Sequence, residues 1–236
     1  MTGPMLILWD IDGTLLSSEG AGAQGMETAG QEVFGEGFSL EGIELGGRLD
    51  PLIVKEALAR MGDTELEPHH ATFRETFHGS LKQLLEGDHP LRILPGAREL
   101  LVALADMPGV TQGLVTGNYQ ETAELKLRAA DIDPSMFAFG VYGDDGQIRN
   151  ELPPKALQRA KEHLGDEPEV VILVGDTPHD VTSGKAAGCH VLAVCTGSHD
   201  ADVLEAAGAD LIIDDLSEVD AVLVWMRIVR ETWNHS

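Results

Sequence analysis

Six short, largely apolar runs constrain the fold of this chain more than any other feature of its sequence. They are rich in Val, Ile and Leu, and they occupy residues 5–9, 111–115, 138–142, 170–174, 191–194 and 211–213. Helix-like stretches lie between most of them, at 97–105, 121–130, 154–164 and 180–187. Strands without polar alternation, separated by helices, are typical of a parallel sheet that is covered on both faces. We therefore predict an α/β fold.

The interval 18–89 departs from this pattern, because it contains helix-like segments such as 50–61 but no convincing strand. Asp50 is expected to be the N-cap of that segment, with Pro51 at the first helical position and Gly62 at the end. A helical domain inserted into the α/β domain explains the change of pattern. The predicted boundaries are 18–89 for this cap domain, and 1–17 with 90–236 for the core.

The balance of charges excludes two classes of partner. The 236 residues include 40 Asp or Glu and only 16 Lys or Arg, which gives a formal net charge of −24 at pH 7. This charge repels phosphate backbones and anionic lipid surfaces, so we expect neither nucleic acid nor a membrane as the main partner. An anionic ligand then needs local cations, a metal ion or backbone N–H groups at its site.

Cysteine usage and the lengths of the apolar runs predict a cytoplasmic protein. Cys189 and Cys195 are too few for a disulfide framework or a four-ligand zinc site, which fits a reducing cytosol, and we expect both to be small buried apolar residues. The run 5–9 is followed at once by Asp10 and Asp12, and the later runs are also strand-sized. We therefore predict neither a signal peptide nor a membrane span.

Polar residues follow the apolar runs directly, where the predicted strands end. They are Asp10, Asp12, Thr116, Gly117, Asn118, Asp144, Asp145, Arg149, Gly175, Asp176, Thr177 and Asp180. Because the carboxyl ends of parallel strands meet at one edge of a sheet, these residues are expected to converge there. The carboxylates that we predict to bind a metal ion are Asp10, Asp12, Asp176 and Asp180. They would repel one another unless a hard cation such as Mg²⁺ neutralised them. For Asp180 the alternative role is the N-cap of the following helix.

The chemistry of phosphoryl transfer assigns roles to the first two of these acids. A carboxylate at a strand end can attack phosphorus and form an aspartyl-phosphate, and Asp10 is placed for that step. An acid two residues further on can protonate the leaving oxygen and later deprotonate the attacking water, and Asp12 is placed for both steps. The pair predicts a hydrolysis that proceeds through a covalent intermediate.

Small and hydroxyl-bearing residues beside these acids are predicted to contact the phosphoryl group. Gly13 allows a tight turn, and Thr14 can hydrogen-bond within it. Thr116, together with backbone N–H groups near Gly117 and Asn118, can hold phosphoryl oxygens at a helix start. For Asn118 a simple helix cap is an equal alternative.

These segments resemble the ordered motifs of the haloacid dehalogenase superfamily, in its phosphatase branch. Asp-Ile-Asp-Gly-Thr-Leu at 10–15 matches the first signature at every position, and Thr116 matches the Thr or Ser of the second motif. Gly-Asp-Thr-Pro-His-Asp at 175–180 matches the acidic fourth motif, and 184–188 matches the Gly-x-x-Ala-Gly that follows it. Order and spacing agree over nearly the whole chain.

The resemblance implies a Rossmann-like, doubly wound core with a helical cap inserted after the first motif, as in phosphoglycolate phosphatase-like members. It also implies a Mg²⁺ ion held by Asp10, the backbone carbonyl of Asp12, and Asp176, with Asp180 in support. The dehalogenases of the superfamily are disfavoured, because they carry a non-acidic residue where this chain has Asp12, and because a halide leaving group needs no proton.

The third motif is where this chain departs from the superfamily, which most often has Lys-Pro-x-Pro before the helix that precedes the fourth motif. No such string exists here, and Arg149 lies at the corresponding place, upstream of Pro153 and Pro154. We favour Arg149 as the catalytic cation. Lys155 is the competitor, because its long stem could still reach from the first helical turn.

One cap residue is a candidate for substrate contact. Arg48 follows Gly46 and Gly47 just before the helix predicted at Asp50. In related proteins with this type of cap a loop here faces the active site, so the resemblance implies that Arg48 reads the anionic or hydroxylated end of the substrate. A solvated surface arginine is the alternative.

The sequence therefore predicts a Mg²⁺-dependent phosphatase, a monomer or weak homodimer, that acts on a small phosphorylated metabolite through Asp10 and Asp12. Phosphoglycolate is a candidate substrate only at the level of the family. One alternative is a sugar phosphomutase, which shares the core and the nucleophile. The other is a non-catalytic phospho-acceptor or binding module, against which the inserted cap argues, since a cap excludes water and shapes a substrate pocket.

Overall fold

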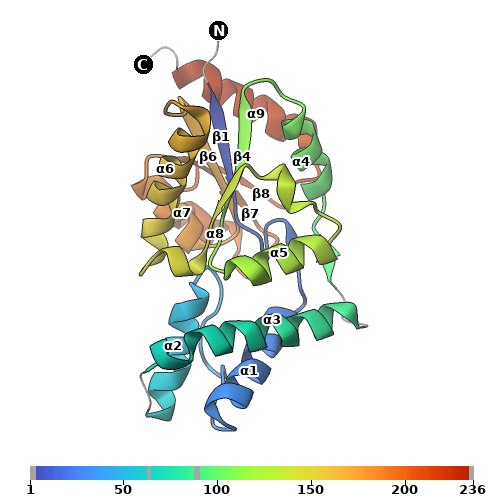
Figure 1. Ribbon diagram of the computed structural model, residues 1–236. Coiled ribbons are helices and arrows are strands. Elements are labelled where there is room, and N and C mark those ends of the chain that lie inside the picture. The colour runs from blue at the N-terminus through green and yellow to red at the C-terminus, as the bar shows by residue number, and fades with distance from the viewer. Residues whose placement is uncertain (1–3, 63–64, 88–90, 234–236) are drawn as a thin grey trace.

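A six-stranded parallel sheet forms the centre of the molecule (Figure 1), in a computed structural model that describes residues 4–62, 65–87 and 91–233. The strands lie in the order β5–β4–β1–β6–β7–β8. Their bounds are β1 (Met5–Trp9), β4 (Val110–Val115), β5 (Phe139–Val141), β6 (Val170–Gly175), β7 (His190–Val194) and β8 (Leu211–Ile213). The chain adds strands first on one side of β1 and then on the other. The predicted α/β class with a doubly wound parallel sheet is confirmed.

Both faces of the sheet are buried, as the unbroken apolar runs predict. In β1, Met5, Ile7 and Trp9 enter one hydrophobic cluster, whereas Leu6 and Leu8 enter another on the opposite face. The first face is covered by α4 (Ala97–Ala105), α5 (Gln120–Ala129) and α9 (Val219–Trp233). The second is covered by α6 (Leu152–Leu164), α7 (Pro178–Ala186) and α8 (Ala201–Ala207).

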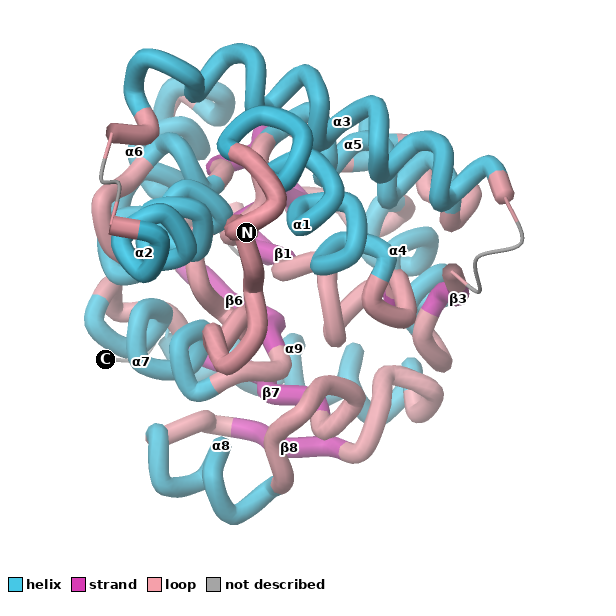
Figure 2. Tube along the Cα trace, turned by 90° about the horizontal axis from the view of Figure 1, so that it is seen from below, coloured by secondary structure: helices cyan, strands magenta, loops and turns pink. Residues whose placement is uncertain are grey.

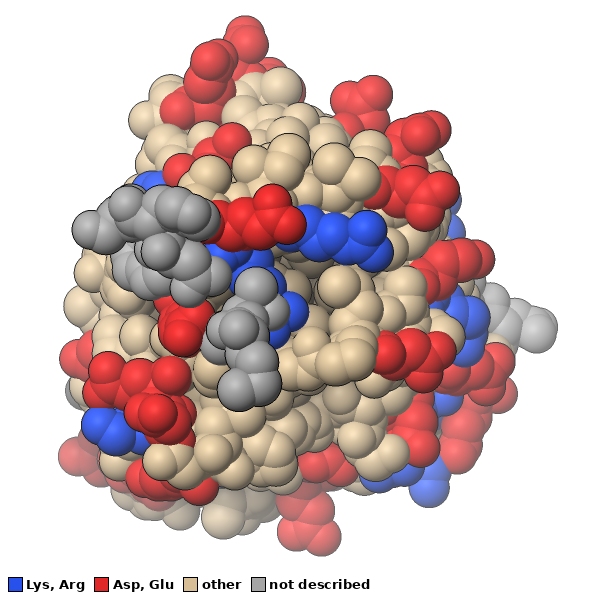
Figure 3. All heavy atoms as spheres, turned by 90° about the horizontal axis from the view of Figure 1, so that it is seen from above, with Lys and Arg blue, Asp and Glu red and all other residues tan. Residues whose placement is uncertain are grey.

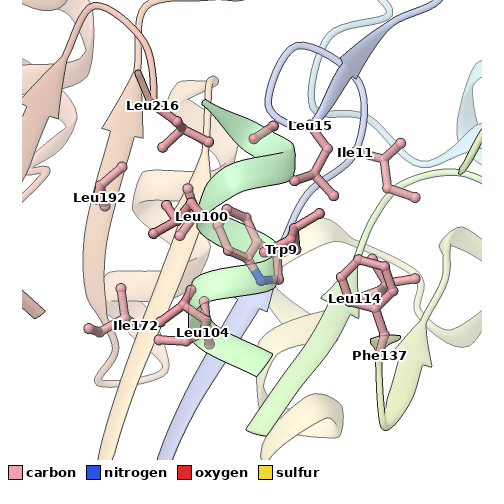
Figure 4. Packing of buried hydrophobic residues seen from close by; sticks show 14 of the residues in the cluster. Trp9, Ile11, Leu15, Leu100, Leu104, Leu114, Phe137, Ile172, Leu192 and Leu216 are labelled. Atoms are coloured by element: carbon pink, nitrogen blue, oxygen red, sulfur yellow. The ribbon is translucent and has the colours of Figure 1, made fainter. Parts of the chain in front are cut away.

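Trp9 shows how tightly the first of these faces is packed. Its ring lies beside Leu100 and Leu104 of α4 (Figure 4), and its side chain is fully buried. The indole nitrogen donates a hydrogen bond to Gln112 Oε1 at 3.1 Å, and the Gln112 amide donates in turn to the Leu101 carbonyl at 3.1 Å. The buried polar atoms of the Trp9 and Gln112 side chains, next to the strand end that carries Asp10, therefore have hydrogen-bond partners.

Three helices below the carboxyl ends of the strands form a separate unit (Figure 1). They are α1 (Ala21–Phe34), α2 (Asp50–Met61) and α3 (His70–Glu86), with the short helix η1 (Glu67–His69) before the last. Helix α1 packs along α3 (Figure 2), around a core of its own that contains Phe38, Phe73 and Phe77. Between residues 18 and 87 the described part of the chain contains no strand. The exact cap boundaries stay a prediction, and residue 89 lies outside the described residues.

A two-stranded antiparallel ribbon joins the cap to the core. It consists of β2 (Leu16–Ser17) and β3 (Arg92–Ile93), where the chain leaves the core and returns to it. The sequence analysis does not contain this ribbon, because two-residue strands carry no periodicity. The pairing brings both connections side by side, so the cap is attached by two adjacent segments.

The predicted start of α2 is wrong in one detail. The helix spans Asp50–Met61 and ends at Gly62, whose φ is +85°, as expected, but its N-cap is Leu49. The Asp50 carboxylate caps nothing in its own helix and instead accepts a hydrogen bond from the Tyr119 backbone N–H at 3.0 Å. Burial raises the pKa of Asp50 to about 7, while Lys126 and the Tyr119 N–H oppose the rise. Asp50 therefore ties the cap to the start of α5.

Arg74 of α3 makes a second tie between cap and core. Its guanidinium pairs with Glu121 at 2.7 Å and with Asp144 at 2.6 Å, and it lies 4.9 Å from the centre of the Tyr119 ring. The Tyr119 hydroxyl and His70 Nε2 are 3.0 Å apart. Asp144, predicted among the strand-end residues of the site, is thus part of the contact between the two units.

Acidic side chains are spread around the end of the molecule opposite the cap (Figure 3). In the described ranges, no helix combines the length and the apolar character that crossing a membrane requires. The cytoplasmic location and the monomeric or weakly dimeric state stay predictions.

Candidate active site

A pocket of about 210 Å³ lies between the carboxyl ends of the strands and the cap. Predicted site residues that line it from the core are Asp10, Asp12, Thr116, Gly117, Asn118, Arg149 and Asp176. The cap contributes Arg48 and a wall of apolar side chains, Ala23, Met26, Leu45, Ile53 and Phe77. Residues that are far apart in sequence thus meet at one edge of the sheet, as the predicted parallel topology requires.

Three carboxylates form a buried cluster on the core side. Oxygens of Asp10, Asp176 and Asp180 lie within 4.8 Å of one another. Burial raises the pKa of Asp10 to about 7; Arg149 opposes the rise, and Asp180 adds to it. Burial, then Asp180 and Asp10, also raise the pKa of Asp176 above its ordinary value. Ionising all three acids at once is costly. Their oxygens are a set of hard ligands of the kind that a divalent cation prefers.

The carboxylate of Asp12 points away from this cluster. Its Oδ2 lies 2.6 Å from Lys126 Nζ and accepts from Asn118 Nδ2 at 2.8 Å, while Oδ1 accepts from Ser18 Oγ at 3.4 Å. Its side chain is 39% exposed, on the side of the pocket. A role for the backbone carbonyl of Asp12 as metal ligand stays a prediction, and this orientation leaves the carboxylate available for proton transfer.

The turn after Asp10 is held against the fourth motif. Gly13 has a φ of +79°, and a Cβ at this position would overlap the Asp176 carboxylate. The Thr14 hydroxyl donates to Asp176 Oδ1 at 3.1 Å rather than bonding within its own turn. Gly13 and Thr14 therefore position Asp176, whereas their contact with a phosphoryl group stays a prediction.

Arg149 is the cation beside the nucleophile candidate. Its Nη2 lies 3.1 Å from Asp10 Oδ1, it pairs with Asp180, and it donates to the Val115 carbonyl at 3.4 Å. Burial alone would lower the pKa of Arg149, but Asp180 and Asp10 outweigh it and raise the pKa above its ordinary value. Its buried Nε has no hydrogen-bond partner among the residues that the structure describes.

Lys155, the competitor for this role, is turned elsewhere. Its ammonium donates to the carbonyl of Asp145. The Asp145 carboxylate accepts from the Tyr142 N–H at 2.9 Å and pairs with Arg159 at 2.6 Å, so Asp145 does not join the predicted cluster. The geometry favours Arg149 over Lys155, and the catalytic role itself stays a prediction.

Asp180 is not the N-cap of the following helix, so the alternative role considered for it is wrong, and its role as a metal ligand stays a prediction. Thr177, not Asp180, is the N-cap of α7, and Asp180 is the third residue of a capping box. Its Oδ2 accepts from the Thr177 backbone N–H at 3.1 Å and from the Thr177 hydroxyl at 2.6 Å, and its Oδ1 pairs with Arg149. Asp180 therefore supports the cluster through bonds that also start the helix.

The segment after β4 lies against both cap and core. The Gly117 carbonyl accepts from the Asp50 N–H at 2.8 Å, and a Cβ at Gly117 would overlap the Arg48 carbonyl oxygen. Asn118 does not cap α5, since Tyr119 is the N-cap, so the cap alternative is wrong. Instead the Asn118 amide donates to Thr116 Oγ1 and to Asp12 Oδ2, both at 2.8 Å.

Arg48 borders the pocket, but its charge is already paired. Its Nη1 lies 2.6 Å from Glu56 Oε2 and donates to the Glu44 carbonyl at 3.2 Å. Its side chain is 23% exposed, so the freely solvated alternative does not describe it. Substrate contact by Arg48 stays a prediction.

Besides Ser18, which the sequence analysis has only as the start of the cap domain, two polar pocket residues are missing from the predicted site. Asp50 was expected only as a helix cap, and Lys126 is in none of the recognised motifs. Lys126 lies on the buried side of α5 with Ala123 and Leu127. A lysine at helical spacing within an apolar stripe is a signal that could have revealed it.

A comparison with protein families agrees with this geometry. The family model described as haloacid dehalogenase-like hydrolase matches residues 4–188. The chain belongs to that family. The resemblance stated from the motifs is therefore confirmed, and with it the expectation of a hydrolase.

Individual relatives of this haloacid dehalogenase-like hydrolase point the same way. The pyrophosphatase PpaX of Oceanobacillus iheyensis is 26% identical over 218 residues, which cover 92% of this chain and 95% of the relative. A predicted phosphoglycolate phosphatase from Haemophilus somnus has a TM-score of 0.69 at 22% identity, covering 94% of this chain and 99% of that one. A putative β-phosphoglucomutase from Thermotoga maritima has a TM-score of 0.62 at 21% identity, covering 93% of this chain and 98% of that one. The two structures show a shared fold, and the predicted phosphatase class agrees with the name of the first relative, a pyrophosphatase.

Proposed function

We propose that this protein is a Mg²⁺-dependent phosphomonoester hydrolase that acts on a small phosphorylated metabolite through an aspartyl-phosphate on Asp10. The observation that carries the proposal is that Asp10 and Asp12 share one pocket but have opposite surroundings. Asp10 lies in a buried acidic cluster beside Arg149, and Asp12 is bonded to Lys126 on the pocket side. Two acids with such different environments suit a nucleophile and an acid–base catalyst.

The acidic cluster fits a magnesium ion. Asp10 and Asp176 have raised pKa values because burial and like charges oppose their ionisation, and a divalent cation would remove that cost. We assign Asp10, the Asp12 carbonyl and Asp176 as the residues that would hold it, with Asp180 in support. When bound, Mg²⁺ supplies charge stabilisation for the nucleophile and the phosphoryl oxygens.

The first step is attack of an Asp10 carboxylate oxygen on phosphorus. The new O–P bond forms as the bond to the leaving oxygen breaks, and Asp12 donates a proton to that oxygen. Arg149, the Thr116 hydroxyl and N–H groups near Gly117 stabilise the charge on the transferred group.

The second step releases phosphate. Asp12, now ionised, removes a proton from water, and that water attacks phosphorus of the aspartyl-phosphate. The O–P bond to Asp10 breaks, inorganic phosphate leaves, and both carboxyl groups return to their initial states.

The cap side of the pocket supports a small leaving group. A volume of about 210 Å³ beside an apolar wall suits a small phosphate ester. At its border we assign Arg48 to the non-reacting end of the substrate, for which it would have to exchange its contact with Glu56. Phosphoglycolate, named in the Haemophilus somnus structure, has the size to be tested first.

An assay of free phosphate against a panel of phosphate esters tests the proposal. We expect repeated turnover that needs added Mg²⁺ and is lost in Asp10→Asn. A phosphomutase would instead convert a hexose or pentose phosphate to an isomer without releasing phosphate. A phospho-acceptor module would release at most one equivalent, so turnover separates the three alternatives.

A further inference from the structure

Lys126 reaches the active site from outside every motif discussed above. Its side chain is 4% exposed, and its Nζ lies 2.6 Å from Asp12 Oδ2 and 2.7 Å from Asn118 Oδ1. Its neighbours on the buried side of α5, Ala123 and Leu127, enter the hydrophobic core. A buried ammonium is costly unless it is paired, so the bonds to Asp12 and Asn118 explain its presence on this apolar face.

These bonds make the two oxygens of Asp12 unequal. Oδ2 accepts from Lys126 Nζ and, at 2.8 Å, from Asn118 Nδ2, whereas among the residues that the structure describes Oδ1 accepts only the long 3.4 Å bond from Ser18 Oγ. An oxygen that accepts two short hydrogen bonds has no lone pair free for a proton in the same plane. A proton carried by Asp12 therefore belongs on Oδ1.

The same lysine orients Asn118. Because Asn118 Oδ1 accepts from Lys126, its Nδ2 faces Asp12 and Thr116. Thr116 Oγ1 accepts from Asn118 Nδ2 at 2.8 Å, which leaves the Thr116 hydroxyl hydrogen to donate to a ligand in the pocket. One ammonium thus sets the direction of the polar groups on this side of the pocket.

We propose that Lys126 is a positioning residue that directs Asp12 Oδ1 to the leaving oxygen, and that enables this enzyme to use esters whose leaving groups need a proton. The inference rests on the proposed function. Without the lysine, the exposed carboxylate of Asp12 has other rotamers available, and proton delivery is misaligned while Asp10, Arg149 and the acidic cluster keep their contacts.

The dependence on leaving group separates this role from a structural one. An alkyl phosphate expels a basic alkoxide and depends on proton donation, whereas p-nitrophenyl phosphate expels a weakly basic phenolate and depends on it little. The parameter kcat/KM covers phosphoryl transfer to Asp10 and excludes later hydrolysis of the intermediate. The ratio of kcat/KM for the two esters therefore measures proton delivery by Asp12.

The experiment compares Lys126→Met with the native protein on glycerol phosphate and p-nitrophenyl phosphate. We expect kcat/KM to fall by roughly 10²-fold for glycerol phosphate, the usual size of a general-acid contribution, and by much less for p-nitrophenyl phosphate. Lys126→Arg, which keeps a cation, should recover part of the loss on the alkyl ester. Lys185→Met is the matched control, because Lys185 also pairs with an aspartate, Asp210 at 2.8 Å, but on the surface.

Equal losses on both esters, or no loss on either, would overturn the proposal. If Lys126→Met does not fold, Asn118→Ala removes the other short bond to Asp12 Oδ2 and should shift the same ratio in the same direction; an unchanged ratio in that variant also overturns it. Failure of the proposed function would look different, because the native protein would then release no phosphate from either ester.

Discussion

The two walls of the pocket are built on different principles. On the core side the carboxylates and cations bond to one another across long sequence separations, as Arg149 does with Asp10 and Asp180. On the cap side the wall is mostly apolar, and its cation, Arg48, is paired with Glu56 of its own domain. In the proposed function the core wall binds the phosphoryl group, and the cap wall faces whatever is attached to it. Changes on the core side should affect every ester, whereas changes on the cap side should affect the choice among esters.

The strongest test of the core wall is Asp10→Asn. An amide cannot form the aspartyl-phosphate, so we expect kcat to fall by roughly 10⁴-fold or more for all esters. Phosphate release is the measurement, and Asp202→Asn, at an exposed position of α8, is the control. Substantial turnover in Asp10→Asn would mean that another residue attacks phosphorus.

Removing metal should have the next largest effect. Chelation is expected to lower kcat by roughly 10³-fold, since a metal ion supplies several kcal/mol of charge stabilisation, and Mg²⁺ should restore it. The acidic cluster of Asp10, Asp176 and Asp180 carries this expectation. Activity that persists after exhaustive chelation would contradict it.

The same acidic cluster predicts how the stabilisation of the folded protein by Mg²⁺ depends on pH. The pKa of Asp10 in the folded protein, about 7, exceeds its ordinary value of 3.8, so the folded state holds this proton more tightly. Its contribution to stability is therefore present at low pH and is lost as pH rises through about 7. Mg²⁺ replaces the proton, so it should raise Tm more at about pH 8 than at about pH 5. An equal rise in Tm at both pH values would mean that the ion binds elsewhere. The variant Asp176→Asn should abolish the difference between the two pH values.

The choice between the two third-motif cations sharpens the description of the core wall. Arg149→Ala should lower kcat by roughly 10²-fold, as for loss of one preorganised electrostatic group, whereas Lys155→Ala should change it much less. Arg149→Ala also leaves buried acids unpaired, so Tm is measured alongside, and Arg149→Lys is the milder comparison. The opposite ranking would transfer the role to Lys155.

The smallest expected effect tests the cap wall. Arg48→Ala should lower kcat/KM for phosphoglycolate by roughly tenfold, about the loss of one charged hydrogen bond, and should leave p-nitrophenyl phosphate nearly unchanged. Glu56→Gln is the companion variant, because it frees Arg48 from its present partner and should act in the opposite direction. Equal losses on the two esters would indicate a defect in the cap rather than in recognition.

Much of the framework could be read from local sequence. The predicted strand runs agree with the observed strands to within one residue at either end, and helices 50–61 and 97–105 match their predicted bounds. Strands that are buried on both faces have no polar alternation, and this local property marks them without any knowledge of their neighbours. The motif acids Asp10, Asp12 and Asp176 follow from the same runs, because a strand end defines where its polar residue lies.

What the sequence did not determine is which polar groups bond to one another. From the sequence Asp50 is expected to be a helix cap, Asn118 a helix cap or a contact to the phosphoryl group, and Arg48 a contact to the substrate or a solvated surface residue. In the structure Asp50 bonds to Tyr119, Asn118 to Asp12, and Arg48 to Glu56.

Lys126 is the clearest case, because it is 114 positions from Asp12, and only the packing of α5 into the core cluster that also holds residues of β1 brings them within 2.6 Å. Burial makes an unpaired charge costly, so each buried polar group takes the partner that tertiary packing supplies. The local sequence determined the strands, the helices and the acids at their ends, and the packing of those elements decided the partners.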